Sequence, residues 1–196
     1  MLRWRRLEVS GGFLLVLAMV YYLDGQNLLP WALLACGCHE LGHICALHVL
    51  GGRVRRLRLS AMGAELVLAA THPLGHGAQA LAALAGPAVN LLLAIFTAQM
   101  GERFYLFAGL NLALAAFNLL PVTQLDGGRA LAALVALLWS PGAGAGALQA
   151  LSAATLLCLL LGGGLLLRQG GTGFTLLIGA IWLAAPLIRG KLHISQ

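Results

Sequence analysis

Residues 29–50 read LPWALLACGCHELGHICALHVL, an apolar run long enough to form one membrane-spanning helix. Within it, His39 and His43 are four positions apart, so both imidazoles project from one face of a helix and can share a metal ion. Glu40 follows the first histidine and can reach water at such a metal. Ionisable groups in a span cost at least ~2.5 to 3.5 kcal/mol each, so this cluster indicates a functional site.

The composition of the whole chain agrees with a membrane location. Of the 196 residues, 60% are hydrophobic and 9% are charged, and the mean hydropathy is +0.90. These values exclude an ordinary soluble domain. The formal net charge is +6, but the basic residues lie at the ends of apolar segments, where they set topology and contact headgroups. We therefore expect a lipid bilayer and no nucleic acid as a partner.

Polar or Gly/Pro breaks separate six apolar runs, at about 7–23, 28–50, 74–98, 104–138, 144–167 and 173–188. The sequence therefore predicts an all-α polytopic membrane protein, a single domain over 1–196 with about six transmembrane helices. The fourth run, interrupted near Pro121 to Gly128, is either one helix broken at the LDG motif or two short helices. Basic residues slightly favour six spans and a cytoplasmic N-terminus.

The segment between the second and third runs, GGRVRRLRLSAMGAELVLAATHP, favours a short β-hairpin or re-entrant segment with a turn near Met62 and Gly63. Its second strand is a candidate to bind a substrate by main-chain pairing, through Leu66, Val67 and Leu68. The alternative is a basic amphipathic connector lying on anionic lipid.

A third metal ligand can be sought by elimination. Catalytic zinc commonly has three protein ligands and a fourth position for water. The chain has six acidic residues, and apart from Glu40 only Asp126 is expected at membrane depth. In the six-span arrangement it lies at the same depth as His39. The alternative for Asp126 is the N-cap of the following helix, and both roles can coexist.

Three segments together resemble the signatures of the site-2 protease family: HELGH at 39–43, LAGPAVNLLLA at 84–94 and NLLPVTQLDGGR at 118–129. The resemblance covers about 28–140. The compact size and the basic inner segment are similar to the bacterial branch that contains the stage IV sporulation protein FB. No PDZ insertion and no nucleotide-binding regulatory domain fits in this chain, so control would come from a partner membrane protein, from substrate presentation or from the chain's own segments.

The resemblance implies a metalloendopeptidase with one Zn²⁺ per chain, held by His39, His43 and Asp126, with Glu40 as the general base. It implies that Asn118 positions the substrate or polarises its carbonyl; a backbone hydrogen bond at a helix break is the alternative. Asn90 matches the GPxxN signature and is a candidate to contact substrate, or to form an interhelical hydrogen bond.

The expected function is cleavage of a transmembrane or membrane-associated protein within a bacterial cytoplasmic or forespore membrane. Processing of a sporulation pro-sigma factor is the narrower expectation. A different membrane zinc protease, with a downstream glutamate as third ligand, is disfavoured because Glu65 and Glu102 fall in connectors. The non-enzymatic alternative is an inactive metal-binding scaffold or carrier, which would not need Glu40.

Overall fold

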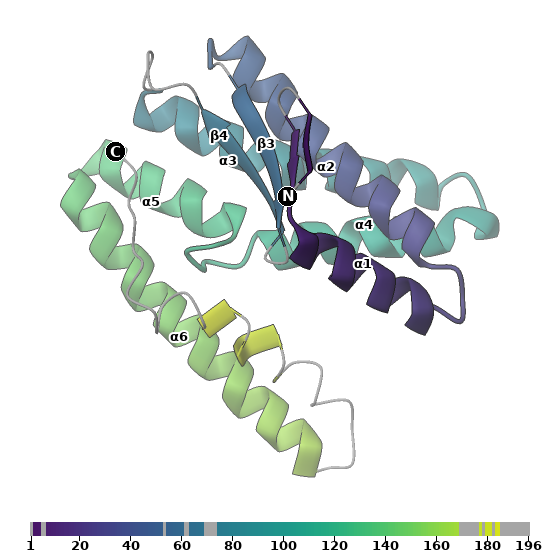
Figure 1. The fold of residues 1–196 in the computed structure, drawn as a ribbon. Coiled ribbons are helices and arrows are strands. Elements are labelled where there is room, and N and C mark those ends of the chain that lie inside the picture. Colours follow the sequence, from purple (N-terminus) through teal and green to yellow (C-terminus); the bar gives the residue numbers. More distant parts are fainter. Residues whose placement is uncertain are drawn as a thin grey trace. The chain divides into compact units, whose positions relative to one another are not determined.

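The computed structural model divides the chain into two compact units, Met1–Asn118 and Leu119–Gln196. The structure describes residues 2–4, 7–52, 54–60, 63–68, 74–168, 177, 179–181 and 183–184. Figure 1 traces their ribbon, and each unit is described by itself. The single domain over 1–196 stays a prediction.

Helices make up most of the first unit. They are α1 (Gly11–Leu23), α2 (Leu29–Val49), α3 (His76–Ala98), the short 3₁₀ helix η1 (Glu102–Phe104) and α4 (Tyr105–Asn118). Small residues let α2 and α3 approach closely, because a Cβ added to Gly42 would lie 2.9 Å from the Ala85 carbonyl oxygen and from Val89 Cγ2. Such contacts between backbones are typical of helices that pack within membranes.

A four-stranded sheet completes the first unit, with strand order β1-β2-β3-β4. Its strands are β1 (Leu2–Trp4), β2 (Leu7–Val9), β3 (Val54–Ser60) and β4 (Gly63–Leu68). Strand β2 pairs antiparallel with β1 and parallel with β3, and β3 pairs antiparallel with β4. The helical span expected over 7–23 is therefore wrong at its start, because Leu7–Val9 is a strand.

An ion pair links the N-terminal strands to β3. The buried carboxylate of Glu8 accepts a 2.7 Å hydrogen bond from Arg56 Nη1 and lies 3.7 Å from Arg58 Nε. The pairing of Glu8 with Arg58 in the β2–β3 register places these groups side by side. Charge pairing thus explains why a segment expected to begin a helix instead joins a sheet.

The connection from α1 to α2 is ordered by Asp24. Its two carboxylate oxygens accept hydrogen bonds from the backbone N–H groups of Leu28 at 2.9 Å and Leu29 at 2.7 Å. The N–H groups at a helix start have no partner within the helix, so an acceptor here stabilises the beginning of α2. These hydrogen bonds lower the pKa of Asp24 below its ordinary value, and the bond from Leu29 has the largest effect.

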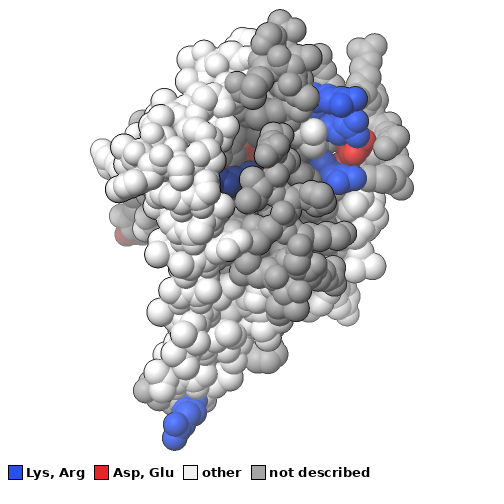
Figure 2. All heavy atoms as spheres, turned by 90° about the vertical axis from the view of Figure 1, so that its left-hand side faces the viewer, with Lys and Arg blue, Asp and Glu red and all other residues white. Residues whose placement is uncertain are grey.

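Among the residues that the structure describes, three helices are long and apolar enough to cross a membrane, namely α2, α3 and α6 (Pro141–Arg168), and α1 is a shorter apolar helix. These helices mark an integral membrane protein. Most of the described surface in Figure 2 carries no charged residue, as expected for a protein surrounded by lipid. The expectation of six spans is not confirmed, since α1, α4 and α5 have only 13, 14 and 13 residues.

The second unit begins with the irregular backbone 119–125, followed by α5 (Asp126–Leu138) and α6, which lie side by side in Figure 1. The helix break predicted in the fourth apolar run is therefore at 119–125. Ser152 of α6 orders it: its hydroxyl accepts from the Thr123 N–H at 3.1 Å and donates to the Pro121 carbonyl at 3.3 Å. The expected sixth span at 173–188 lies largely outside the described residues.

The core of the second unit is a small apolar cluster that includes Val122, Leu125, Leu156 and Leu183. Two of its members come from the irregular segment and one from α6. This burial fixes the backbone just before α5. Asp126, the first residue of α5, therefore directly follows an ordered backbone segment.

Candidate metal centre

His39 and His43 lie one turn apart on α2, and both side chains are buried. Their Nε2 atoms are 3.1 Å apart, and the ring planes are close to perpendicular, at 82°. The helical spacing brings the two rings to one face, as the sequence predicted. Two imidazole nitrogens therefore converge on one point inside the first unit.

Helix α3 holds the ring of His43 from one side. His43 Nδ1 lies 2.7 Å from the carbonyl oxygen of Ala82, which can only accept a hydrogen bond. One turn further along α3, Gly86 leaves room for the ring, because a Cβ at this position would overlap it. The glycine of the GPxxN signature thus has a steric role, and the ring orientation is set by the main chain of α3.

The ring of His39 is oriented by a side chain. Its Nδ1 lies 2.6 Å from Oδ1 of Asn90, a residue that is fully buried on α3. The amide group of Asn90 donates through Nδ2 to Oδ1 of Asn111 at 2.7 Å and to the carbonyl of Ala35 at 3.3 Å. Because Nδ2 faces two acceptors, the amide oxygen of Asn90 must face His39.

These contacts decide the tautomers of the two rings when they are neutral. Each Nδ1 faces an oxygen acceptor, so each Nδ1 carries the hydrogen and each Nε2 keeps a lone pair. The two lone pairs of His39 and His43 then face one another across 3.1 Å. A cation placed between the two nitrogens would be attracted by both lone pairs.

Asn111 is a site residue that the sequence analysis did not single out. It is fully buried on α4, accepts the hydrogen bond from Asn90 and donates through Nδ2 to the Phe107 carbonyl at 2.8 Å. An available signal was its position, since an asparagine within an apolar run is costly unless it has a hydrogen-bonding partner. It also lies seven residues before Asn118, which is about two helical turns.

The two predicted catalytic side chains differ in their surroundings. Glu40 is half buried on α2, next to His39 in sequence. Asn118 is the last residue of α4, is half buried, and donates through Nδ2 to the Leu114 carbonyl at 3.0 Å. This backbone bond is the alternative role that the sequence left open, and it leaves the catalytic role of Asn118 as a prediction.

Asp126, the predicted third ligand, belongs to the second unit. Its side chain is buried, and it is the first residue of α5, whose N-cap is Leu125. The alternative assignment of Asp126 as N-cap therefore does not describe this helix start. The following Gly127 and Gly128 let the helix approach the irregular segment, because a Cβ at either position would overlap the backbone of Leu119 or Val122.

The residues predicted to bind substrate fall in two places. Asn90 is buried beside His39, as described above. Leu66, Val67 and Leu68 lie in β4, at one edge of the described sheet, and the side chain of Val67 is half buried. The side chains of Leu66 and Leu68 lie outside what the structure describes. Binding of substrate by β4 stays a prediction.

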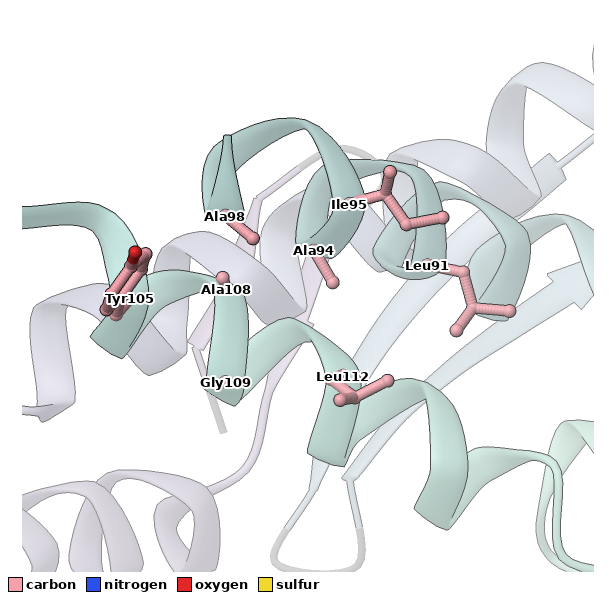
Figure 3. A pocket seen from close by; sticks show the side chains of 8 residues that line it. All are labelled: Leu91, Ala94, Ile95, Ala98, Tyr105, Ala108, Gly109 and Leu112. Atoms are coloured by element: carbon pink, nitrogen blue, oxygen red, sulfur yellow. The ribbon is translucent and has the colours of Figure 1, made fainter. Parts of the chain in front are cut away.

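A separate apolar hollow of about 450 Å³ lies between α3 and α4 (Figure 3). Its walls include Leu91, Ala94, Tyr105 and Leu112. No carboxylate, imidazole or thiol lines it, so it offers no group for hydrolysis or for metal binding. It is a different place from the histidine pair.

Comparison with known proteins gives two similarities. Residues 97–161, about a third of the chain, match the model of peptidase family M50. This segment contains Asn118 and Asp126 but neither histidine of α2. The site-2 protease from Methanocaldococcus jannaschii has a similar structure, with a TM-score of 0.67 and 21% sequence identity over 93% of this chain and 90% of that chain. At this identity the likeness shows the fold. No curated protein matches the sequence.

Proposed function

We propose that the protein is a zinc-dependent intramembrane endopeptidase of the site-2 protease type. The observation that carries the proposal is the pair of buried imidazoles on α2, with both Nδ1 atoms engaged by acceptors and both Nε2 atoms directed at one point. The M50 match over 97–161 and the similar fold of a site-2 protease support the same assignment.

The residues present fit a zinc ion. Two nitrogens bound to one tetrahedral zinc at about 2.0–2.1 Å lie roughly 3.3 Å apart. The separation of His39 Nε2 and His43 Nε2 is 3.1 Å. Zinc favours neutral imidazole ligands whose second ring nitrogen donates a hydrogen bond, and both rings meet that condition. A single positive ion between the two lone pairs would relieve their repulsion.

Asp126 is proposed as the third ligand. The side chain of Asp126 is buried, as is typical of a carboxylate that coordinates a metal ion. Two imidazole nitrogens and one carboxylate oxygen are a donor set typical of catalytic zinc sites. The ordered start of α5 would hold this carboxylate in place. One Zn²⁺ per chain is the expected stoichiometry.

The proposed reaction is hydrolysis of a peptide bond. A bound zinc ion would activate water and polarise the scissile carbonyl. The carboxylate of Glu40 accepts a proton from the attacking water and passes it to the amine as the C–N bond breaks, which leaves a carboxylate and an amine. Asn118 would orient the substrate near this site through its amide. We assign Asn90 to orienting His39 rather than to contacting substrate.

The substrate is proposed to be a transmembrane or membrane-associated protein. The carbonyls of a transmembrane helix are hydrogen-bonded within the helix, so the segment must unwind before attack. Strand β4, with Val67 near its end, is the proposed docking strand, because an edge strand can pair with an extended peptide. Resemblance to the stage IV sporulation branch adds the narrower proposals of a pro-sigma factor substrate, a bacterial membrane and a cytoplasmic N-terminus.

Substitution Glu40→Gln tests this function in purified protein with a transmembrane substrate. We expect the variant to keep one zinc per chain and to lose at least about 100-fold in turnover, the usual effect of removing a general base. Retained zinc with undiminished hydrolysis would refute the role of Glu40. A wild-type protein that transports zinc without hydrolysing any membrane substrate, and whose Glu40→Gln form transports equally well, would favour a carrier.

A further inference from the structure

Two buried asparagines join three helices of the first unit in a directed chain of hydrogen bonds that ends at His39. Asn111 on α4 donates to the Phe107 carbonyl of its own helix and accepts from Asn90 on α3. Asn90 accepts from Nδ1 of His39 on α2. Both asparagines have no exposed surface, so water does not compete for these bonds.

The chain has a fixed direction because it starts at a group that can only accept. The Phe107 carbonyl forces Asn111 to present its NH₂ group there, so Asn111 Oδ1 faces Asn90. Asn90 therefore presents its NH₂ group to Asn111 and its oxygen to His39. Its NH₂ group also faces the Ala35 carbonyl, which favours the same orientation. Neither amide can rotate by half a turn without placing like groups together.

We infer that Asn90 and Asn111 are positioning residues that hold His39 as the Nδ1–H tautomer and so keep its Nε2 lone pair available for a metal ion. The inference deepens the proposed function, on which it rests, by naming what orients one of the ligands. It assigns a role to Asn111, which lies outside the family signatures in the sequence. Asn111 acts only through Asn90.

The two histidines provide an internal comparison. Nδ1 of His43 bonds to the main-chain carbonyl of Ala82, which no change at 90 or 111 removes. Loss of the asparagine chain should therefore release the tautomer of His39 and leave that of His43 unchanged. A general loss of packing would disturb both rings.

Nitrogen-15 NMR of the metal-free protein, with labelled histidine, measures which ring nitrogen carries the hydrogen. In the wild type we expect Nδ1–H for both His39 and His43. Asn90→Leu should shift His39 toward the Nε2–H tautomer, and Asn111→Leu should do so partly, because Asn90 then keeps only the Ala35 carbonyl. Zinc affinity should fall about 10- to 100-fold in Asn90→Leu, the usual effect of losing a partner of a ligand.

Asn90→Asp provides the conservative rescue. A carboxylate still accepts from Nδ1 of His39, so this variant should keep the tautomer and most of the zinc affinity although it loses both donor bonds of Asn90. If Asn90 served only to join helices, Asn90→Asp would be as damaging as Asn90→Leu. Thr97→Val is the matched control, because Thr97 is a buried polar residue of α3 whose hydroxyl donates to the Leu93 carbonyl of the same helix.

The wild-type spectrum alone can overturn the inference, whatever the variants do. Nε2–H on His39 would refute it, and so would an unchanged His39 signal in a folded Asn90→Leu protein. A wild type that shows Nδ1–H on both rings yet binds no zinc would refute the proposed function and leave the asparagine chain supported. The two failures are therefore distinguishable.

Discussion

Gly86 of α3 lies directly against the imidazole ring of His43, so that a Cβ at residue 86 would overlap the ring. The same ring is also held to α3 by the contact between His43 Nδ1 and the carbonyl oxygen of Ala82. A methyl group at this position can be accommodated only if the ring or the helix moves. The position of the His43 ring therefore depends on the absence of a side chain at residue 86.

Substitution Gly86→Ala should therefore displace His43 Nε2 and reduce zinc affinity by about 10- to 100-fold, comparable with the loss of a ligand's supporting partner. Gly109→Ala is the control, because a Cβ at Gly109 of α4 meets nothing within 4 Å. Competition with a chelator of known affinity measures both variants. Equal zinc affinity of Gly86→Ala and wild type would show that the ring is not fixed by this contact.

Removing the carboxylate of Asp126 should abolish stable zinc binding, because only two of the three proposed ligands remain. We expect Asp126→Ala to purify with much less than one zinc per chain and to be inactive. Glu102→Gln is the control, since Glu102 is an exposed carboxylate of η1. Metal analysis of the purified proteins decides the matter, and a full zinc complement in Asp126→Ala would exclude Asp126 as a ligand.

Substitution Asp24→Asn should lower the Tm at neutral pH, because one neutral amide oxygen replaces two charged acceptors at the start of α2. Since hydrogen bonds lower the pKa of Asp24, its stabilising effect is present above the ordinary aspartate pKa and is lost as the pH falls through the lowered value. Thermal unfolding followed by circular dichroism in detergent should show the wild type and variant converging at acidic pH.

A difference in Tm that stays constant from neutral to acidic pH would contradict this explanation. It would indicate that Asp24 acts through its shape rather than its charge. Glu102→Gln again provides the comparison, because Glu102 is an exposed carboxylate of the short helix η1. We expect its Tm to follow that of the wild type at each pH.

The parts of the site that could be predicted from sequence are those set by short-range helical spacing. The four-residue interval between His39 and His43 determines that they share a face, and the structure places their rings together. The helix break before Asp126 follows from Pro121 and the nearby glycines in the same local way. Fold class was predicted less completely, because a sheet was expected only between α2 and α3.

The features that were missed depend on contacts between distant segments. Strand β2 is predicted from the sequence as the start of an apolar helix, because its partner β3 lies about fifty residues away. Register across that distance follows from pairs such as Glu8 with Arg56, which no local pattern reveals. Asn111 was missed for the same reason, since its partner Asn90 is on another helix.

His39 and His43 differ in how a mutation can alter their orientation. The acceptor for His43 is the peptide backbone at Ala82, so every amino acid at residue 82 supplies the same oxygen. The acceptor for His39 is the side chain of Asn90, so a substitution at residue 90 changes the strength and the charge of this acceptor. Variation at residue 90 therefore offers a way to tune one ligand of the proposed centre while the other stays constant.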